Sequence, residues 1–405
     1  MENNKVIEHI MTGWDDCVKE ICEDKGNLIG MPYPYTVPAV GYYDEIYYWD
    51  AYFTNLGLAL SSRWDLVKNN TDNMLFLVEK YGFMPNGNRT FYLGNSQPPF
   101  LSEMVKQVYE HYHDLAWLKG AYSALQTEYE FWQTKRMTSV GLNQYAGASK
   151  DKPINVKAAD FCRRLQYRPS DKTDQQLVDQ YLLSCESGWD CNPRWGFEGW
   201  EYVQVDLNSL LYMFEKNMAY FSICVGSGEE QLWEARAAKR KALMLEFLDN
   251  GGLLYDYNFV NDSFSSVFSV ASLYPLFTNM VDAEYARKAV DNLYRLEADY
   301  GVFACEKNDM PGEMRWNYPM GCGCLQYIVV KALDNYGYKE EAMRIALKYT
   351  SLIEKTYNET GSLWEKYNVV DGNINVIRRA TMPSMMGRTA GTYLVLKNYV
   401  EAKVL

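Results

Sequence analysis

Apolar residues recur along this chain at steps of three and four positions, the spacing that places them on one face of an α-helix. Faces of this kind occur within residues 115–125, 207–214 and 342–349. Good helix formers fill the positions between them, as in EEQLWEARAAKRKALMLEFL at 229–248. Strand-like alternation is sparse, and strands do not alternate with helices. The pattern therefore predicts an all-α protein of roughly ten to twelve helices.

No internal repeat, low-complexity tract or flexible linker divides the sequence. We therefore expect residues 1–405 to form a single domain. The longest irregular stretch, around 138–174, is predicted to be a loop insertion over a functional face rather than a domain boundary. Antiparallel helices in an unbroken series favour hairpins that close into an α/α toroid, although periodicity alone does not separate a toroid from an α-solenoid.

The aromatic content adds a first indication of function. The chain contains 34 Tyr and 11 Trp against 16 Phe. A large hydrophobic core explains many aromatic rings, but a core is served better by Phe. Rings that carry a polar group suit a cleft in which sugar faces stack and hydroxyls form hydrogen bonds. The composition is therefore compatible both with a large core and with a small carbohydrate as substrate.

Charge narrows the range of partners. The chain has 40 Lys and Arg against 52 Asp and Glu, a net charge of −12. This balance repels phosphate backbones and anionic membrane surfaces, so we expect no nucleic acid and no membrane partner. A run of about 18 apolar residues, which a membrane span requires, is also absent from the sequence.

The cysteines and the N-terminal residues predict a cytoplasmic location. The first residues, MENNKVIEHIMTGW, lack the basic and then apolar pattern of a secretory signal. The nine cysteines are scattered and odd in number, as expected of reduced thiols.

The cysteine spacing does not predict a metal site. Pairs such as Cys17 with Cys22, or Cys322 with Cys324, lack a second ligand pair at zinc spacing. We therefore expect no metal and no cofactor.

Candidate chemistry is concentrated in four segments between helices, at residues 45–53, 85–100, 186–195 and 363–368. Each segment mixes Trp or Tyr with amide or charged side chains. Loops held by a rigid helical scaffold are where binding groups usually gather. These segments are therefore the predicted binding and catalytic region.

The same segments carry a resemblance to the trehalase family of glycoside hydrolases. PNGNRTFYLGNSQPPF resembles the signature of that family, and YYWDAYF, ESGWD followed by Arg194-Trp195, and VDLNSLLYMFE resemble further segments of it. WNYPMGCGCLQ and WEKYN are weaker matches. The matches follow the order of the family and span roughly residues 38–391. The resemblance implies an (α/α)6 toroid of about twelve helices and hydrolysis of a small α-glucoside with inversion of configuration.

Carried across residue by residue, the resemblance places Asp190 at the general acid and Glu365 at the general base. Glycoside hydrolysis needs one carboxylic acid to protonate the leaving oxygen and one carboxylate to activate water on the opposite face. Trp189 precedes Asp190 and is expected to line the substrate site and to raise the pKa of this carboxyl by providing an apolar wall.

The remaining segments supply candidates for binding the sugar. Trp49 and Asp50 are expected to hold the glycone, by stacking and by accepting hydrogen bonds from hydroxyls. Asn86, Gln97 and Trp316 are further candidates. Helix packing explains the two tryptophans as well, and turn formation in PNGN explains Asn86.

Several positions depart from the family pattern. Three further positions are expected to bind substrate: Tyr42 and Asn95 stand where the family has arginines, whereas Arg168 retains a third one. Arg388 is a candidate replacement cation, and Asn317 replaces the Asp of a Trp-Asp pair. Both proposed catalytic carboxylates are present while the surrounding recognition groups differ. This pattern predicts an active enzyme of altered specificity that uses trehalose poorly.

Other functions fit parts of the sequence. A glucosylglycerate or mannosylglycerate hydrolase shares the acid and base arrangement, and Arg168 or Arg388 would pair with the carboxylate of its substrate. A sugar epimerase works through histidines, and this chain has only three. A non-catalytic sugar-binding protein is the alternative outside enzymes, and the presence of both carboxylates disfavours it.

Overall fold

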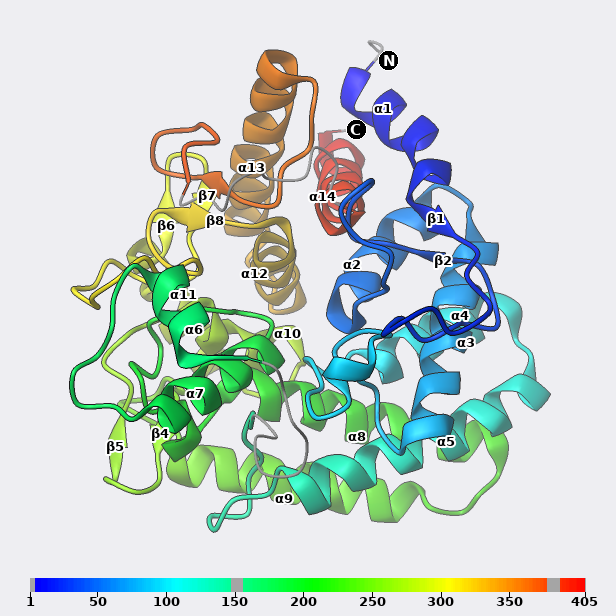
Figure 1. Ribbon diagram of the computed structural model, residues 1–405, viewed down its shortest axis with the longest axis horizontal. Coiled ribbons are helices and arrows are strands. Elements are labelled where there is room, and N and C mark those ends of the chain that lie inside the picture. The colour runs from blue at the N-terminus through cyan, green and yellow to red at the C-terminus, as the bar shows by residue number, and fades with distance from the viewer. Residues whose placement is uncertain (1–3, 147–155, 377–386, 405) are drawn as a thin grey trace.

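The structure, a computed structural model, describes residues 4–146, 156–376 and 387–404. Within these residues the chain is built mainly of helices (Figure 1). The α-helices are α1 (Lys5–Gly13), α2 (Tyr48–Leu60), α3 (Trp64–Tyr81), α4 (Leu101–Tyr112), α5 (Leu115–Lys135), α6 (Ala158–Leu165), α7 (Asp174–Glu186), α8 (Val205–Val225), α9 (Glu230–Phe247), α10 (Tyr274–Phe277), α11 (Ala283–Asp291), α12 (Gly323–Asn335), α13 (Lys339–Thr360) and α14 (Gly387–Val404).

The strands are all two residues long and pair only in an antiparallel sense. They are β1 (Val18–Lys19) with β2 (Tyr35–Thr36); β3 (Tyr202–Val203), β4 (Tyr257–Asn258) and β5 (Ser263–Phe264) in that order; β6 (Glu297–Ala298) with β7 (Gly301–Val302); and β8 (Met320–Gly321) with β9 (Tyr367–Asn368). These short strand pairs hold the connections between helices in place. In the described residues, no helix is long and apolar enough to cross a membrane.

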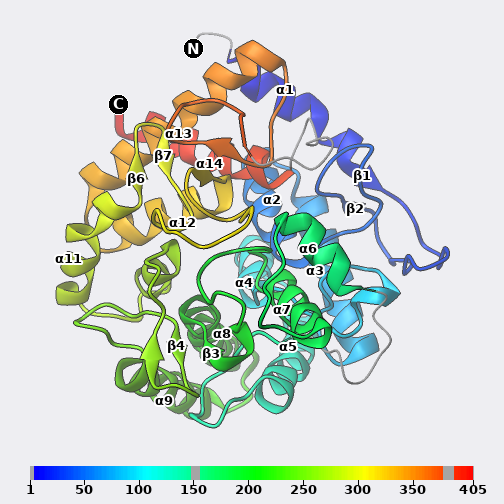
Figure 2. The ribbon, with the colours of Figure 1, turned by 60° about the vertical axis from the view of Figure 1, so that its left-hand side comes forward.

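The helices form an (α/α)6 toroid, which confirms the predicted fold class. Figures 1 and 2 both place α14 beside α2, so the last helix closes the ring onto an early one. Two glycines permit this contact. A Cβ on Gly391 would lie 2.1 Å from the carbonyl oxygen of Phe53, and one on Gly57 would lie 2.4 Å from the Cα of Gly391. The ring therefore closes by a backbone approach that side chains would prevent.

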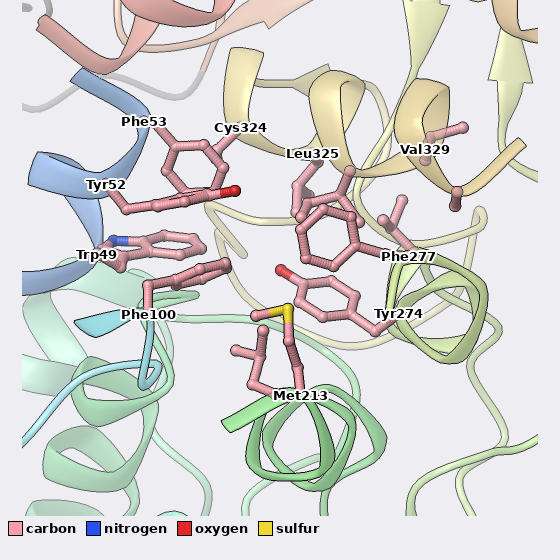
Figure 3. Packing of buried hydrophobic residues seen from close by; sticks show 14 of the residues in the cluster. Trp49, Tyr52, Phe53, Phe100, Met213, Tyr274, Phe277, Cys324, Leu325 and Val329 are labelled. Atoms are coloured by element: carbon pink, nitrogen blue, oxygen red, sulfur yellow. The ribbon is translucent and has the colours of Figure 1, made fainter. Parts of the chain in front are cut away.

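Burial separates inner from outer helices. On α8, 15 of 21 residues are buried, whereas α9 beside it buries four of its 18, so α8 faces the interior and α9 faces solvent. Side chains from α2, α8, α10 and α12 meet at the centre of the ring (Figure 3). Tyr52 stacks on Phe100 there, with ring centroids 4.3 Å apart. Trp49 belongs to this aromatic cluster and also reaches the pocket described below, so the core supports the base of the site.

The stretch predicted as an irregular loop, around 138–174, contains helix α6. Its residues 147–155 lie outside the described part of the chain. Ala158, Phe161 and Leu165 form a buried face on α6, which packs against α7. The helix has only eight residues, too short a run for apolar periodicity to identify it in advance.

Candidate active site

Side chains from all four polar and aromatic segments meet around one pocket of about 430 Å³. The lining residues are Pro38, Tyr43, Tyr47, Trp49, Asp50, Asn86, Phe91, Tyr92, Asn95, Gln97, Val156, Arg164, Tyr181, Leu182, Cys185, Gly188, Asp190, Arg315, Glu365 and Arg388. Segments separated by up to about three hundred residues in sequence therefore face one another. Rings, amides and three carboxylates line it, a composition suited to a hydroxyl-rich ligand.

The turn that carries Asp190 follows the end of α7 and requires a glycine. Gly188 has φ of +74°, and a Cβ there would lie 2.6 Å from the indole of Trp49. Only glycine satisfies both the left-handed backbone and this close approach. The turn therefore brings Asp190 to the pocket beside the first turn of α2.

A buried ion-pair cluster holds the chain beyond Asp190. The Arg194 guanidinium contacts Asp256 at 2.8 Å and Asp206 at 2.6 Å, and all three side chains are buried. The guanidinium also lies over the ring of Trp189, 4.6 Å from its centroid. Since Asp206 is in the first turn of α8, the cluster ties this loop to an inner helix and leaves Asp190 little freedom to move.

Asp190 is surrounded by cationic side chains and by a hydrogen-bond donor. Its Oδ2 lies 3.0 Å from Nη1 of Arg315 and 3.7 Å from Nη1 of Arg164, and its Oδ1 accepts a hydrogen bond from the Trp316 indole at 3.3 Å. Burial acts to raise the pKa of Asp190, but Arg315, Lys366 and Arg164 together outweigh burial, and the pKa is lowered. The carboxyl is therefore ionised in the unliganded pocket.

This direction contradicts the prediction that Trp189 raises the pKa of Asp190. Trp189 is buried and stacks on Trp316, with ring centroids 5.8 Å apart, and it does not line the pocket. The charges that control Asp190 come from distant segments that a reading of neighbouring residues does not reveal.

Glu365 lies within reach of three cations. Its Oε1 is 2.7 Å from Nζ of Lys366 and 2.9 Å from Nη2 of Arg388, and its Oε2 is 3.9 Å from Nη2 of Arg315. Burial acts to raise the pKa of Glu365, but these cations hold it far below its usual range. Glu365 is thus a carboxylate at neutral pH.

Arg388 links Glu365 to Asp50. Its Nη1 lies 3.0 Å from Oδ1 of Asp50, and its guanidinium faces the rings of Trp49 and Trp316. Burial raises the pKa of Asp50 despite the attraction of Arg388. The predicted cation at 388 therefore lies in the pocket, paired with two carboxylates.

The three predicted amides also line the pocket. Asn86 donates to the carbonyl of Ser96 at 3.0 Å, and Gln97 accepts from the Trp49 backbone at 3.2 Å. Asn95 donates to the carbonyl of Leu182 at 2.7 Å, while its buried Oδ1 has no partner among the described residues. These amides fix the loop, and their side chains form part of the pocket wall.

Four predicted binding residues do not line the pocket: Tyr42, Arg168, Trp189 and Trp316. Tyr42 is 49% exposed, and the neighbouring Tyr43 occupies the wall instead. Arg168 is exposed and pairs with Asp174 at 2.6 Å, because α6 ends at Leu165 and the chain turns away. Trp316 packs behind the wall, where it donates a hydrogen bond to Asp190 and lies against the guanidinium of Arg388.

Three cations of this site were not predicted from the sequence: Arg164, Arg315 and Lys366. Arg315 directly precedes the WNYPMGCGCLQ segment, and Lys366 is the neighbour of Glu365, so adjacency to the motifs was an available signal. Arg164 carried no such signal, because α6 itself was not predicted. In the described residues, no group of three or more His, Cys, Asp or Glu side chains is arranged to hold a metal ion.

Comparison with known proteins identifies relatives over most of the chain. Residues 2–388 match the trehalase family. The periplasmic trehalase of Escherichia coli O1:K1 is 31% identical over 397 residues, 91% of this chain and 69% of that protein. The periplasmic trehalase of Salmonella newport is 31% identical over 390 residues, 89% and 67% of the two chains.

Solved structures agree in fold. Neutral trehalase Nth1 from Saccharomyces cerevisiae has a TM-score of 0.80 at 25% identity and covers 97% of this chain and 80% of its own. A mannosylglycerate hydrolase from Thermus thermophilus has a TM-score of 0.64 at 16% identity, over 97% and 98% of the two chains, and shares the fold.

The predicted cytoplasmic location is wrong by this comparison, since the bacterial relatives are named as periplasmic proteins. The cysteines were a poor guide. All nine are free, and five of them are buried, so they serve as packing groups whose number carries no information about the compartment.

Proposed function

Because this chain belongs to the trehalase family of glycoside hydrolases, we propose that it hydrolyses a small α-glucoside with inversion at the anomeric carbon. The family makes it an enzyme that acts on small glycosides; the α-glucoside and the inverting course are the proposal. One observation carries it. The Arg315 guanidinium contacts Asp190 through Nη1 and Glu365 through Nη2, so one side chain joins both carboxyl groups at the same pocket.

In the proposed mechanism Asp190 is the general acid and protonates the glycosidic oxygen as the bond to the anomeric carbon breaks. Glu365 is the general base and takes a proton from the water that attacks the opposite face of the sugar. Its lowered pKa keeps it ionised and able to accept that proton. An inverting pair needs carboxyl groups about 6.5–9.5 Å apart, which leaves room for the water.

The remaining lining groups support binding of the glycone. Asp50 is held by Arg388 and presents acceptor oxygens for hydroxyl groups, while Asn86 and Gln97 add amides from a second segment. The ring of Trp49 provides an apolar surface at the base of the pocket. We propose that residues 1–405 act as one catalytic domain, because the pocket is assembled from segments that span most of the chain.

The stereochemical course is tested by proton NMR of the first sugar released from an α-glucoside. We expect the β-anomer to appear first and the α-anomer to grow later by mutarotation. An initial α-anomer would indicate a covalent intermediate and remove the inverting assignment.

The roles of the two carboxyls are tested by Asp190→Asn and Glu365→Gln. Each amide is nearly isosteric but cannot transfer the proton, so each variant should lose at least about a hundredfold in kcat with its circular-dichroism spectrum unchanged. Glu359→Gln, an exposed residue on α13, is the matched control and should retain full activity. Near-normal rates in either active-site variant would exclude that residue from its role.

A further inference from the structure

One cation of the pocket shares its carboxylate partner with another cation that lies nearer to that carboxylate. Arg164, in the last turn of α6, lines the pocket with its guanidinium over the ring of Tyr181, 4.6 Å from the centroid. Its only ion pair among the described residues is with Asp190, at 3.7 Å, and that oxygen is nearer to Arg315, at 3.0 Å. The side chain is 22% exposed. A guanidinium held this way keeps most of its donors available to a ligand.

The other cations are occupied. Arg388 pairs with Asp50 and Glu365, Lys366 pairs with Glu365, and Arg315 bridges Glu365 and Asp190. Four cations therefore face three carboxylates when all are ionised. The proposed mechanism requires Asp190 to carry a proton, which leaves Arg164 without any anion in the described part of the pocket.

The position of Arg164 relative to the proposed reaction follows from its contacts. A general acid lies against the oxygen of the leaving group. Arg164 pairs with Asp190 and with neither Glu365 nor Asp50 among the described residues, so it lies on the side where the leaving group departs. The other carboxylates, with Arg388, lie on the side of the glycone and the attacking water.

We propose that the leaving group of the natural substrate carries a carboxylate or a phosphate, and that Arg164 binds this anion beside the general acid. The inference rests on the proposed function, since the role of Asp190 defines the leaving-group side. Guanidinium groups bind both anions through paired, charge-assisted hydrogen bonds. Sugars joined to a hydroxy acid and sugars joined to a phosphorylated sugar both belong to this class.

The same anion prepares the acid for catalysis. Burial and Glu365 raise the pKa of Asp190, whereas Arg315, Lys366 and Arg164 lower it. An anion on Arg164 cancels part of the positive charge, so Asp190 takes up a proton from solvent more readily. Substrate binding and activation of the general acid are then coupled, and a neutral substrate leaves the carboxyl largely ionised.

Three aryl α-glucosides test the proposal: 4-carboxyphenyl, 4-phosphonophenyl and, as the neutral counterpart, 4-carbamoylphenyl. Each is assayed with the unaltered enzyme, with Arg164→Gln and with Arg163→Gln. Arg163 is the adjacent residue on α6, is exposed and pairs only with Asp160 in the described structure, so it is matched in charge and helix. For any one substrate the acidity of the leaving group is the same with every variant, so it does not affect the comparison between variants.

In Arg164→Gln we expect the preference for the anionic over the neutral glucoside, measured by kcat/KM, to fall roughly tenfold to a hundredfold. Arg163→Gln should keep the preference, and Arg164→Lys should restore part of it. The better of the two anionic substrates shows whether the site takes a carboxylate or a phosphate. An equal loss on all three substrates, or no loss of preference, would overturn the proposal.

The pH profile of kcat supplies a readout that a structural role does not move. With the anionic glucoside the alkaline limb, which reports the general acid, should lie at higher pH than with the neutral glucoside. In Arg164→Gln this difference should disappear; its persistence would count against the proposal. Absence of hydrolysis of every glucoside by the folded enzyme would instead count against the proposed function, so the two failures are distinguishable.

Discussion

At the scale of single residues, the charge that a side chain carries here depends on partners from distant segments. Asp190 is preceded by a tryptophan, yet Arg315, Lys366 and Arg164 together lower its pKa against the effect of burial. Arg315 and Arg164 lie within 4 Å of the carboxyl, and the combined attraction of the three cations outweighs the effect of burial. Sequence neighbours alone predicted the opposite direction.

Glu128 on α5 shows the reverse case, a buried carboxyl that pairs with no cation in the described part of the chain. Its Oε1 accepts a hydrogen bond of 2.6 Å from the Tyr48 hydroxyl, and burial raises its pKa to about 8. The ordinary value of 4.5 applies to the unfolded chain, so folding is linked to proton uptake between these values. The stabilisation is complete below about pH 4.5 and is lost as pH rises through about 8.

We therefore expect the free energy of unfolding to decrease between these pH values by up to a few kcal/mol, at about 1.4 kcal/mol per pKa unit. Glu128→Gln removes the titrating group and should flatten this dependence. Urea titrations at several pH values measure it. A variant whose stability falls with pH as steeply as that of the parent protein would show that Glu128 is not the group responsible.

At the scale of secondary-structure elements, the ring closes where α14 crosses α2. A methyl group at Gly391 would meet the carbonyl oxygen of Phe53 at 2.1 Å, and neither helix backbone can move without repacking the core around it. Gly391→Ala should therefore lower the free energy of unfolding by about 1–3 kcal/mol.

Gly120, an exposed glycine within α5, provides the matched control. A Cβ there would meet nothing within 4 Å, and alanine is the better helix former, so Gly120→Ala should raise stability by about 0.5–1 kcal/mol. Urea unfolding of both variants measures these changes in the free energy of unfolding. Equal effects of the two substitutions would contradict the close approach at the ring closure.

At the scale of the whole molecule, the fold leaves the choice of substrate open. Proteins named as trehalases and a mannosylglycerate hydrolase share this toroid. Specificity is therefore decided by the side chains that line the pocket. Asn95, which stands where the family pattern has an arginine, lines the pocket with a buried oxygen that has no partner among the described residues.

Loss of one charge-assisted hydrogen bond costs about 1.5–3 kcal/mol, so we expect kcat/KM on trehalose to lie roughly tenfold to a hundredfold below that on the best substrate. A hydrolysis screen of trehalose, kojibiose, nigerose, glucosylglycerate, mannosylglycerate and aryl α-glucosides measures this. Trehalose emerging as the best substrate would show that the departures from the family pattern do not alter specificity.

The sequence by itself determined most of the helices and the segments that build the pocket, and the family resemblance of its motifs implied the closed ring. Helical periodicity is local, and the motifs that contain Asp190 and Glu365 are continuous stretches of chain, so both are readable without a structure. The mixture of aromatic and polar side chains in the four segments was likewise enough to predict that these segments form the binding and catalytic region.

Only the tertiary structure decided which cations face the carboxylates. Arg164 and Arg168 are four residues apart, but α6 ends between them, so one reaches the pocket and the other pairs with Asp174. Tyr43 rather than Tyr42 lines the wall for a similar reason, the local course of a loop. The direction of a side chain depends on where its helix or strand ends, and the pKa of a group depends on charges from every segment that packs nearby. Neighbouring residues in the sequence therefore predict neither of them.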